Sequence, residues 1–402
     1  MSNWRAFNHN HLHHRGKTVS RRVGIVAVAQ TEYEEAKPAW REAEITYQIV
    51  EKLLEETGLS FAEDGTGIDA TVTCSSDHWD GRTLSDIPHG EVSGAHLRAE
   101  EKVSSDGINA VIYAYLQILS GNYDVVLAVT TCKESQTVGH IIENLAFDPV
   151  YQQKIDLDFL AAAALQANRY IHKYGIIPEQ CARVVVKNRS NAKNNPVAQL
   201  RKSVSMEEVL NSTMLAYPLR SLEAKPVSDG ACGLILASEE KAKKLTKKPA
   251  WIVGMGQCYE SHYLGDRDLA ECGALSLAAK RAYRQAGITN PLRDIDLAEI
   301  SEYCSYQELL WSEGLGFCGK GEGGKLIDKG VTQIEGKMPV NPSGGVLSGN
   351  PTLVAGTARV AEVALQLMRK AGARQIPKAR TGLAHGTYGP CGQHHAVLVL
   401  QA

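Results

Sequence analysis

The chain has 402 residues, with 43 Lys and Arg against 45 Asp and Glu, so its formal net charge is −2, and 44% of its residues are hydrophobic. This balance is typical of a soluble globular protein of two or three domains, and it argues against a disordered chain and against a nucleic-acid binder that works through a basic face. No stretch reaches the roughly 18 to 20 apolar residues of a membrane span, and the polar start lacks a secretory core, so we expect a cytoplasmic protein that binds neither membrane nor nucleic acid.

Nine cysteines are scattered along the chain without a CxxC pair. We therefore expect neither a disulfide framework nor a metal site in this chain. The first 21 residues carry four histidines among polar residues, and this composition predicts a mobile His-rich tail.

The first ordered element is expected at 23–30, a continuous apolar run typical of a strand buried on both faces. A helix over 43–57 should follow and end at Gly58, since glycine is the usual residue after a helix C-terminus. Next come an expected strand over 68–74, a helix over 107–119 and a strand over 123–130. This order is β-α-β-α-β.

The second half repeats the order at a constant offset. The strand signal at 251–260 lies 227 residues after that at 24–33, and 294–298 resembles 67–71 at the same offset. Two matches at one offset predict an internal duplication in which each half forms one sheet covered by helices.

We therefore expect an N-terminal half over 22–240 and a C-terminal half over 248–402. The first half contains an inserted region at about 139–227, largely polar and helical in pattern, in which 188–196 is interpreted as an exposed turn.

A glycine-rich segment near the C-terminus carries the chemical signal. Asn341-Pro342-Ser343-Gly344-Gly345 is followed by Gly349-Asn350-Pro351 and an expected helix that starts near Pro351. The glycines allow the backbone to approach a ligand closely, and a helix N-terminus directs N–H groups at negative charge. This environment suits a thioester oxygen that becomes negative in a transition state.

The segment resembles the NPSGG motif of the thiolase family. Matching pieces lie in the family's order at 106–107, 227–231 and 308–310. The resemblance implies an α/β thiolase fold of two duplicated βαβαβ halves, stacked in α-β-α-β-α layers.

Three positions depart from the family's pattern. Ser104 stands where the resemblance places the nucleophilic Cys, and Ser301 and Asn350 stand where it places two histidines. Neither Ser301 nor Asn350 acts as a general base near neutral pH, although Asn350 can donate a hydrogen bond to an oxyanion and Ser104 can hydrogen-bond nearby. Ordinary thiolase chemistry therefore does not follow from the resemblance.

The loop before the last expected strand, 396–400, carries Cys391. In thiolases this loop holds a second reactive Cys that moves a proton and activates the thiol of coenzyme A, and the resemblance makes Cys391 its counterpart. The nearby His385, His394 and His395 are candidates to lower the pKa of that thiol. Because His394 and His395 enter a strand side by side, only one of them can face the site.

Three functions stay open. The first is a coenzyme A dependent thiolase or acyltransferase that cleaves or forms a C–C bond in a β-ketoacyl-CoA, with coenzyme A as co-substrate and no permanently bound cofactor. The second is an acyl-CoA retro-aldol lyase in which Tyr303 or a histidine is the acid or base, and the third is a non-catalytic acyl-CoA binding or scaffold subunit. The candidate catalytic residues are Cys391, Asn350, Ser104, Tyr303 and His385. The candidate substrate-binding residues are Gly345, Gly392, Tyr388, Ser301 and His394.

Residues 316–322 resemble a stretch of the thiolase-like proteins that work with a small zinc-ribbon/OB-fold subunit. That group includes archaeal acetoacetyl-CoA thiolases and benzoylsuccinyl-CoA thiolase. The resemblance implies such a partner, which would hold any zinc, and a homodimer formed near 106–130. The loops at 75–94 and 139–158 carry no recognisable code for the acyl chain.

Overall fold

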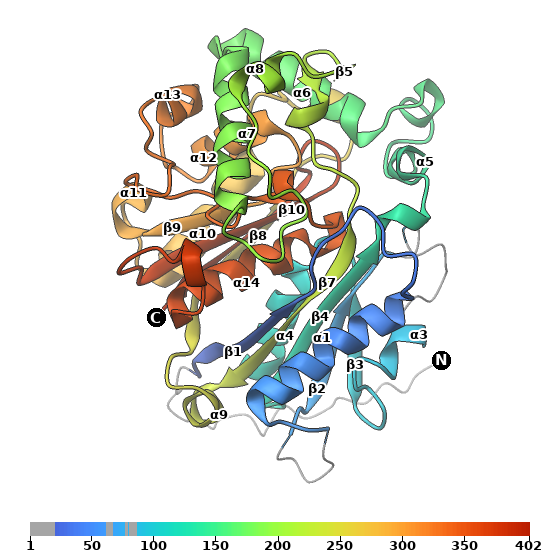
Figure 1. Ribbon diagram of the computed structural model, residues 1–402, viewed down its shortest axis with the longest axis vertical. Coiled ribbons are helices and arrows are strands. Elements are labelled where there is room, and N and C mark those ends of the chain that lie inside the picture. The colour runs from blue at the N-terminus through green and yellow to red at the C-terminus, as the bar shows by residue number, and fades with distance from the viewer. Residues whose placement is uncertain (1–20, 62–66, 77–78, 80–86) are drawn as a thin grey trace, which may run out of the picture.

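The computed structural model describes residues 21–61, 67–76, 79 and 87–402 (Figure 1). The predicted tail, Arg21 apart, lies outside the described residues. Within them, no helix is both long and apolar enough to span a bilayer. The central feature is a mixed sheet of nine strands in the order β3-β2-β4-β7-β1-β8-β11-β10-β9.

The five strands on one side of this sheet come from the first half of the chain. They are β1 (Val23–Gln30), β2 (Ala70–Cys74), β3 (Ala99–Val103), β4 (Val125–Lys133) and β7 (Asp229–Ser238). The four strands on the other side come from the second half. They are β8 (Ala250–Tyr259), β9 (Leu297–Ile300), β10 (Thr381–Tyr388) and β11 (His394–Gln401).

Both halves have the same strand pairing. β1 and β8 each lie antiparallel to the last strand of their half, β7 and β11. β2 and β9 each lie parallel to the strand that follows the central helix, β4 and β10. Even the edge is repeated, because β2 pairs in parallel with β3 and Ala298 forms a parallel bridge with Val340. The structure thus contains the duplication that the offset of 227 residues indicates.

Asp69 and Asp296 show the duplication at the level of single atoms. Oδ2 of Asp69 accepts hydrogen bonds from the backbone N–H groups of Asp124 (2.7 Å) and Val125 (2.9 Å). Oδ2 of Asp296 accepts them from Arg380 (2.8 Å) and Thr381 (2.9 Å). These carboxylates satisfy the backbone at the start of the neighbouring strand, which is why β2 and β9 begin only after the aspartates.

Five layers result from the packing of four helices. Helix α1 (Glu42–Thr57) contacts β1, β4 and β7 from outside, and α10 (Gly273–Ala286) contacts β8 and β11 from the opposite outer side. Helices α4 (Ile108–Leu119) and α14 (Ala355–Met368) contact each other and form the layer between the two parts of the sheet. Figure 1 shows α14 crossing the centre of the molecule. The predicted thiolase fold is confirmed.

The middle layer is held by a buried carboxyl group. Asp106 accepts hydrogen bonds from the N–H of Ile108 at the start of α4 and from that of Gly356 at the start of α14, both at 2.9 Å. A Cβ atom on Gly356 would lie 1.7 Å from Asp106 Oδ1, so only glycine fits there. Burial raises the pKa of Asp106 to about 7, against the lowering effect of these two bonds.

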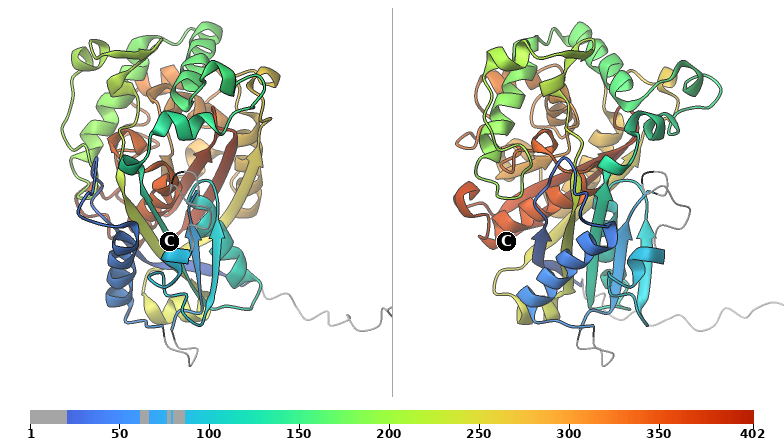
Figure 2. Two further views of the ribbon diagram at one scale, coloured as in Figure 1. Left: turned by 90° about the vertical axis from the view of Figure 1, so that its right-hand side faces the viewer. Right: turned by 45° about the vertical axis from the view of Figure 1, so that its right-hand side comes forward.

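The inserted region forms a cap of helices and one small hairpin over one end of the sheet (Figure 2). It contains α5 (Gly139–Asn144), α6 (Phe159–Tyr174), α7 (Pro178–Ala192), α8 (Met206–Leu210), β5 (Met214–Ala216) and β6 (Leu219–Arg220). The remaining helices are α3 (Ile87–Gly90), α9 (Glu239–Leu245), α11 (Pro291–Asp294), α12 (Ser305–Gly314) and α13 (Gly323–Asp328). The boundaries expected for the two halves and the insert stay predictions.

Two expectations about local structure are wrong. The exposed turn expected at 188–196 begins inside α7, and Asn188, Asn191 and Asn195 are buried because their amides bond groups of the second half. The helix expected near Pro351 begins at Ala355, because a 3₁₀ turn over Thr352–Val354 comes first.

The repeated aspartates give a test of the duplicated framework. Replacing Asp69 or Asp296 with Ala should each lower the free energy of unfolding by about 1 to 3 kcal/mol, because two backbone N–H groups lose their acceptor. Urea unfolding followed by circular dichroism measures the change, with Asp266→Ala as the exposed control. Midpoints equal to that of the control would contradict this role.

Candidate active site

A cavity of about 910 Å³ lies where the insert meets both halves of the sheet. Among the described residues that line it are Glu34, Glu35, Glu134, Glu143, Phe159, Leu160, Ala163, Leu215, Ala224, Lys225, Tyr303, Cys304, Gln307, Thr352, Gly389, Cys391 and Gly392. Of the predicted site residues, the structure brings Cys391, Gly392 and Tyr303 together here.

Cys391 sits in a tight turn after β10. Its backbone is left-handed (φ 53°), as are those of Gly389 and Gly392, and the N–H of Gly392 donates to the carbonyl of Gly389 (3.2 Å). The thiol donates to the carbonyl of Ala162 on α6 (3.2 Å). Burial raises the pKa of Cys391 to about 12, so the resting sulfur is a thiol and needs a proton acceptor to react.

Arg267 fixes this turn through hydrogen bonds to its backbone carbonyls. Its guanidinium donates to the carbonyls of Pro390 (3.0 Å), Cys391 (2.7 Å) and Gly392 (3.4 Å), and it lowers the Cys391 pKa somewhat against the effect of burial. Gln166 on α6 adds a bond from Nε2 to the Cys391 carbonyl (3.3 Å). The position of the thiol is therefore set by the insert and by the second half together.

Tyr303 follows β9 and faces the cavity. Its hydroxyl donates to the carbonyl of Thr387 (2.9 Å), and its N–H donates to Gln307 Oε1 (2.9 Å). Burial, with Asp106 and Tyr388 nearby, raises the pKa of Tyr303 well above 10, so the hydroxyl stays protonated and keeps a proton to donate.

A buried carboxylate, Glu134, ties three segments to the cavity wall. It accepts hydrogen bonds from Lys225 Nζ (2.7 Å), from the N–H of Ser228 (3.0 Å) and from both the N–H and the hydroxyl of Thr352 (2.7 and 2.6 Å). Because both oxygens are engaged, Glu134 positions Lys225 and Thr352 and has little capacity left to move a proton.

Glu143 on α5 is the cavity carboxyl with a pKa near neutrality. One oxygen accepts from the N–H of Phe159 (3.2 Å). The Glu143 pKa is raised to about 7, mainly by burial and less by Asp158 and Glu134, against the lowering effects of the Lys225 ammonium and the Phe159 N–H. Glu143 can therefore accept or release a proton in the physiological range.

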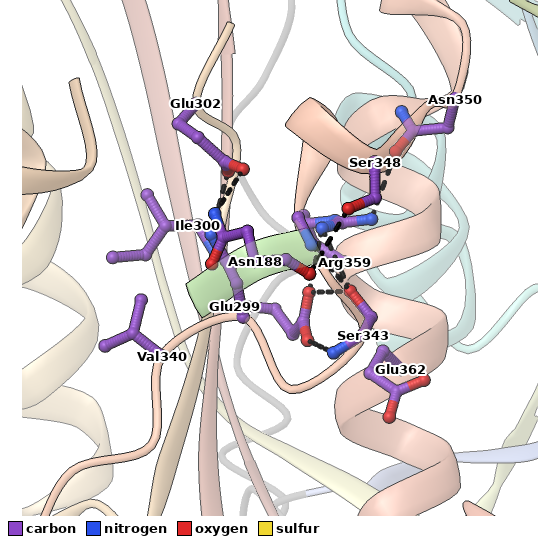
Figure 3. Close-up of polar contacts among 12 residues, drawn as sticks. Asn188, Glu299, Ile300, Glu302, Val340, Ser343, Ser348, Asn350, Arg359 and Glu362 are labelled. Carbon is purple, nitrogen blue, oxygen red and sulfur yellow. Dashed lines mark hydrogen bonds and ion pairs between the residues drawn. The ribbon is translucent and has the colours of Figure 1, made fainter. Parts of the chain in front are cut away.

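The Asn341–Gly345 segment lies beside the cavity in a buried polar cluster. Figure 3 shows Glu299, Ser343 and Arg359 pointing toward one another. Ser343 donates to Glu299 through its N–H (2.9 Å) and its hydroxyl (2.7 Å), and Arg359 pairs with the same carboxylate (2.9 Å). Asn341 donates to Glu302 (2.8 Å) from the other end of the segment.

Two of the predicted site residues, Gly345 and Asn350, make contacts within this cluster. A Cβ on Gly345 would lie 1.9 Å from Glu302 Oε1, so this glycine packs against a carboxyl group and does not line the large cavity. Asn350 is buried, its Oδ1 accepts from Arg359 (3.1 Å) and its Nδ2 donates to the Pro351 carbonyl (3.3 Å). Their predicted roles toward substrate remain untested.

The three histidines lie outside the described cavity lining. His385 and His395 share a hydrogen bond (2.9 Å) and pack on Trp311, whereas His394 stacks on Tyr259 with ring centres 4.4 Å apart. Burial lowers the pKa of His385 to about 3 and that of His394 to about 4, so these rings are neutral at pH 7.

The other predicted residues also lie off the cavity. Ser104 is exposed just before α4, and Ser301 is completely buried after β9. Tyr388 reaches the site indirectly through an edge contact with Phe159 (6.3 Å between ring centres). In the described part of the chain, no three His, Cys, Asp or Glu side chains are grouped as a metal site requires.

Comparison with known proteins identifies the family to which this chain belongs. The thiolase N-terminal domain matches residues 23–240, and the thiolase C-terminal domain-like family matches residues 256–402. The chain belongs to the thiolase family. It is 37% identical over 303 residues to the acetyl-CoA acetyltransferase of Methanothermobacter thermautotrophicus, an alignment that covers 74% of this chain and 78% of that enzyme.

One further relative and two solved structures extend the comparison. The benzoylsuccinyl-CoA thiolase subunit BbsB of Thauera aromatica is 32% identical over 300 residues, which cover 72% of this chain and 76% of that subunit. A solved structure entitled Ltp2-ChsH2(DUF35) aldolase superposes with a TM-score of 0.81 at 24% identity, covering 95% of this chain and 98% of that one. Human mitochondrial 3-ketoacyl-CoA thiolase has a TM-score of 0.70 at 17% identity, over 96% and 99% of the two chains. Both superpositions support the fold.

Proposed function

We propose that the chain cleaves or forms the C–C bond of a β-ketoacyl-CoA, with Cys391 as the reacting thiol and coenzyme A as co-substrate. The observation that carries the proposal is the placement of Cys391 on the wall of the large cavity, in a turn fixed by Arg267. Ser104, at the usual nucleophile position, is exposed and outside the described lining. The family's acyl-CoA chemistry supports the substrate class.

The cleavage needs one nucleophile and one proton carrier. Glu143 takes the proton of the Cys391 thiol, the sulfur attacks the β-keto carbon, and the bond between the α and β carbons breaks. The electron pair goes to the α carbon, which takes the proton back from Glu143, and this fragment leaves as acetyl-CoA with the original thioester. The thiol of coenzyme A then attacks the acyl-cysteine, gives its proton to the Cys391 sulfur through Glu143, and carries the acyl group away.

Mass spectrometry tests the nucleophile. After incubation with acetoacetyl-CoA and an aromatic 3-ketoacyl-CoA, we expect an acyl adduct on the peptide that contains Cys391, because this thiol shares the cavity with Glu143. The Cys391→Ala variant should carry no adduct. Cys304→Ala, which removes another thiol of the same cavity wall, should keep the adduct. An adduct on Ser104, or one retained in Cys391→Ala, would contradict the assignment.

The pH dependence of cleavage tests Glu143. As the base that accepts the thiol proton, Glu143 must be ionised, so kcat/KM should rise as the pH passes upward through about 7. Glu143→Gln should lose this rise and fall in kcat/KM by roughly 10²- to 10⁴-fold. Glu35→Gln changes an exposed carboxylate at the same cavity and serves as the control. An unchanged pH profile in Glu143→Gln would rule out the role.

A second candidate function, an acyl-CoA retro-aldol lyase, is favoured by Tyr303. Its protonated hydroxyl can donate to a developing oxyanion in place of the Thr387 carbonyl, while Glu143 would take the proton of a β-hydroxyl group. Release of an aldehyde from a 3-hydroxyacyl-CoA, without a protein adduct, would establish this reaction. A subunit that only binds acyl-CoA would show neither adduct nor turnover.

We also propose a homodimer that recruits a small zinc-ribbon/OB-fold subunit. Support comes from the surface position of the 316–322 segment, where Lys320 is 74% exposed and pairs with Glu271, while Glu313 accepts the N–H groups of Gly321 (2.8 Å) and Gly323 (2.9 Å). The relative from Thauera aromatica is itself named a subunit. A cytoplasmic location stays an expectation, supported by nine cysteines that form no disulfide in the part of the chain that the structure describes.

The subunit composition can be measured directly. Size-exclusion chromatography with light scattering should give twice the 43.7 kDa of one chain for the purified protein. Affinity purification from the native host should add a small zinc-containing chain, whose recovery Lys320→Glu lowers because the exposed segment changes charge. Lys52→Glu, on the surface of α1, should leave recovery unchanged. A native complex without a second chain would contradict the partnership.

A further inference from the structure

A second cavity, of about 410 Å³, lies under the small β5–β6 hairpin. Its buried lining includes Ala167 on α6, Cys181 on α7 and Tyr306 on α12, and its rim carries the exposed apolar side chains of Met214 and Tyr217. None of the functions considered so far uses this cavity.

The two cavities share four structural segments. Ala163 on α6 lines the first cavity, and Ala167, one turn further along the same helix, lines the second. In three other segments, one residue likewise lines the first cavity and a neighbouring residue lines the second. Each pair is given with the residue of the first cavity first. These pairs are Leu215 and Met214, Ala224 and Glu223, and Cys304 and Tyr306. The two spaces are therefore neighbours, lined by adjacent residues of the same four segments.

The buried polar groups of the second cavity are engaged within the protein, whereas Asn168 and His172 lie at its exposed edge. Glu223 accepts from the Ser305 hydroxyl (3.0 Å) and from the N–H of Arg220 (3.1 Å), and the Tyr306 hydroxyl donates to Gln166 (2.8 Å). Burial raises the pKa of Glu223, which favours its neutral form. The buried part of the lining therefore offers apolar surface and satisfied polar atoms, an environment that favours a neutral hydrocarbon ligand.

We propose that this second cavity receives the far end of a long apolar acyl chain whose thioester end lies at Cys391. The inference rests on the proposed function and adds the substrate class, a long-chain β-ketoacyl-CoA. The residues of α6 that line the two spaces run from Phe159 to His172, about 20 Å of helix at 1.5 Å per residue, so a short acyl group ends within the first cavity and a long one extends past Ala163.

Selectivity for the length of the acyl chain tests whether the second cavity receives its far end. The quantity measured is the ratio of kcat/KM for 3-oxohexadecanoyl-CoA to that for acetoacetyl-CoA, in Ala167→Phe, in Met214→Trp and in the control Leu165→Phe, which changes an exposed position of α6. The first two variants should lower the ratio at least about tenfold, since each methylene kept from apolar surface costs about fourfold in affinity. Met214 is 40% exposed, so its variant stays informative if Ala167→Phe does not fold.

An unchanged ratio in Met214→Trp, or an equal fall in the control, would overturn the proposal. If the unmodified protein turns over neither substrate, the proposed function fails. Calorimetric binding of palmitoyl-CoA and acetyl-CoA then tests separately whether the second cavity receives the acyl chain. Weaker binding of palmitoyl-CoA alone in Met214→Trp supports this role of the cavity, and equal affinities for both ligands in all variants overturn it.

Discussion

Three buried carboxyl groups, those of Glu299, Glu302 and Glu308, determine how the second half of the chain can fold. Taking a charge out of water costs several kcal/mol, so each group must find a cation or a set of donors. Glu299 pairs with Arg359, and Glu308 pairs with Lys187 of the insert (2.7 Å). Burial nevertheless raises the pKa of both Glu299 and Glu302. The course of the glycine-rich segment follows from these carboxyl groups.

The insert thereby becomes part of the active-site framework. Asn188 of α7 donates to both Glu302 (3.0 Å) and Glu308 (2.9 Å), while Gln166 of α6 links the Tyr306 hydroxyl to the Cys391 carbonyl. The Cys391 turn and the glycine-rich segment are thus attached to neighbouring helices of one cap. A change in the cap alters the geometry at the thiol even where it touches no substrate.

The sequence predicted the duplicated sheets well because their signal is local. Apolar runs define the strands, and the same aspartate recurs at Asp69 and Asp296 because it performs the same backbone contact twice. Cys391 and Tyr303 could be found from their motifs. The polar run around Asn188 was misread as exposed, since its carboxylate partners lie more than a hundred residues away.

The remaining active-site groups had no sequence signal. Glu134, Glu143 and Lys225 belong to no motif, and they meet at the cavity only because the insert folds back over the sheet. Likewise, the sequence offers His385 as a partner for the thiol, but the strand register turns the ring toward His395 and Trp311. Side-chain direction in three dimensions decided both outcomes.

The grip of Arg267 on the Cys391 turn has an electrostatic consequence. It draws the carbonyls of Pro390, Cys391 and Gly392 to one side, and in a trans peptide the N–H points opposite to the carbonyl. The dipoles of three successive peptide groups therefore align across the turn, with their positive ends directed away from Arg267. Arg267 thus fixes the orientation of the peptide groups on both sides of Cys391 as well as the position of the thiol.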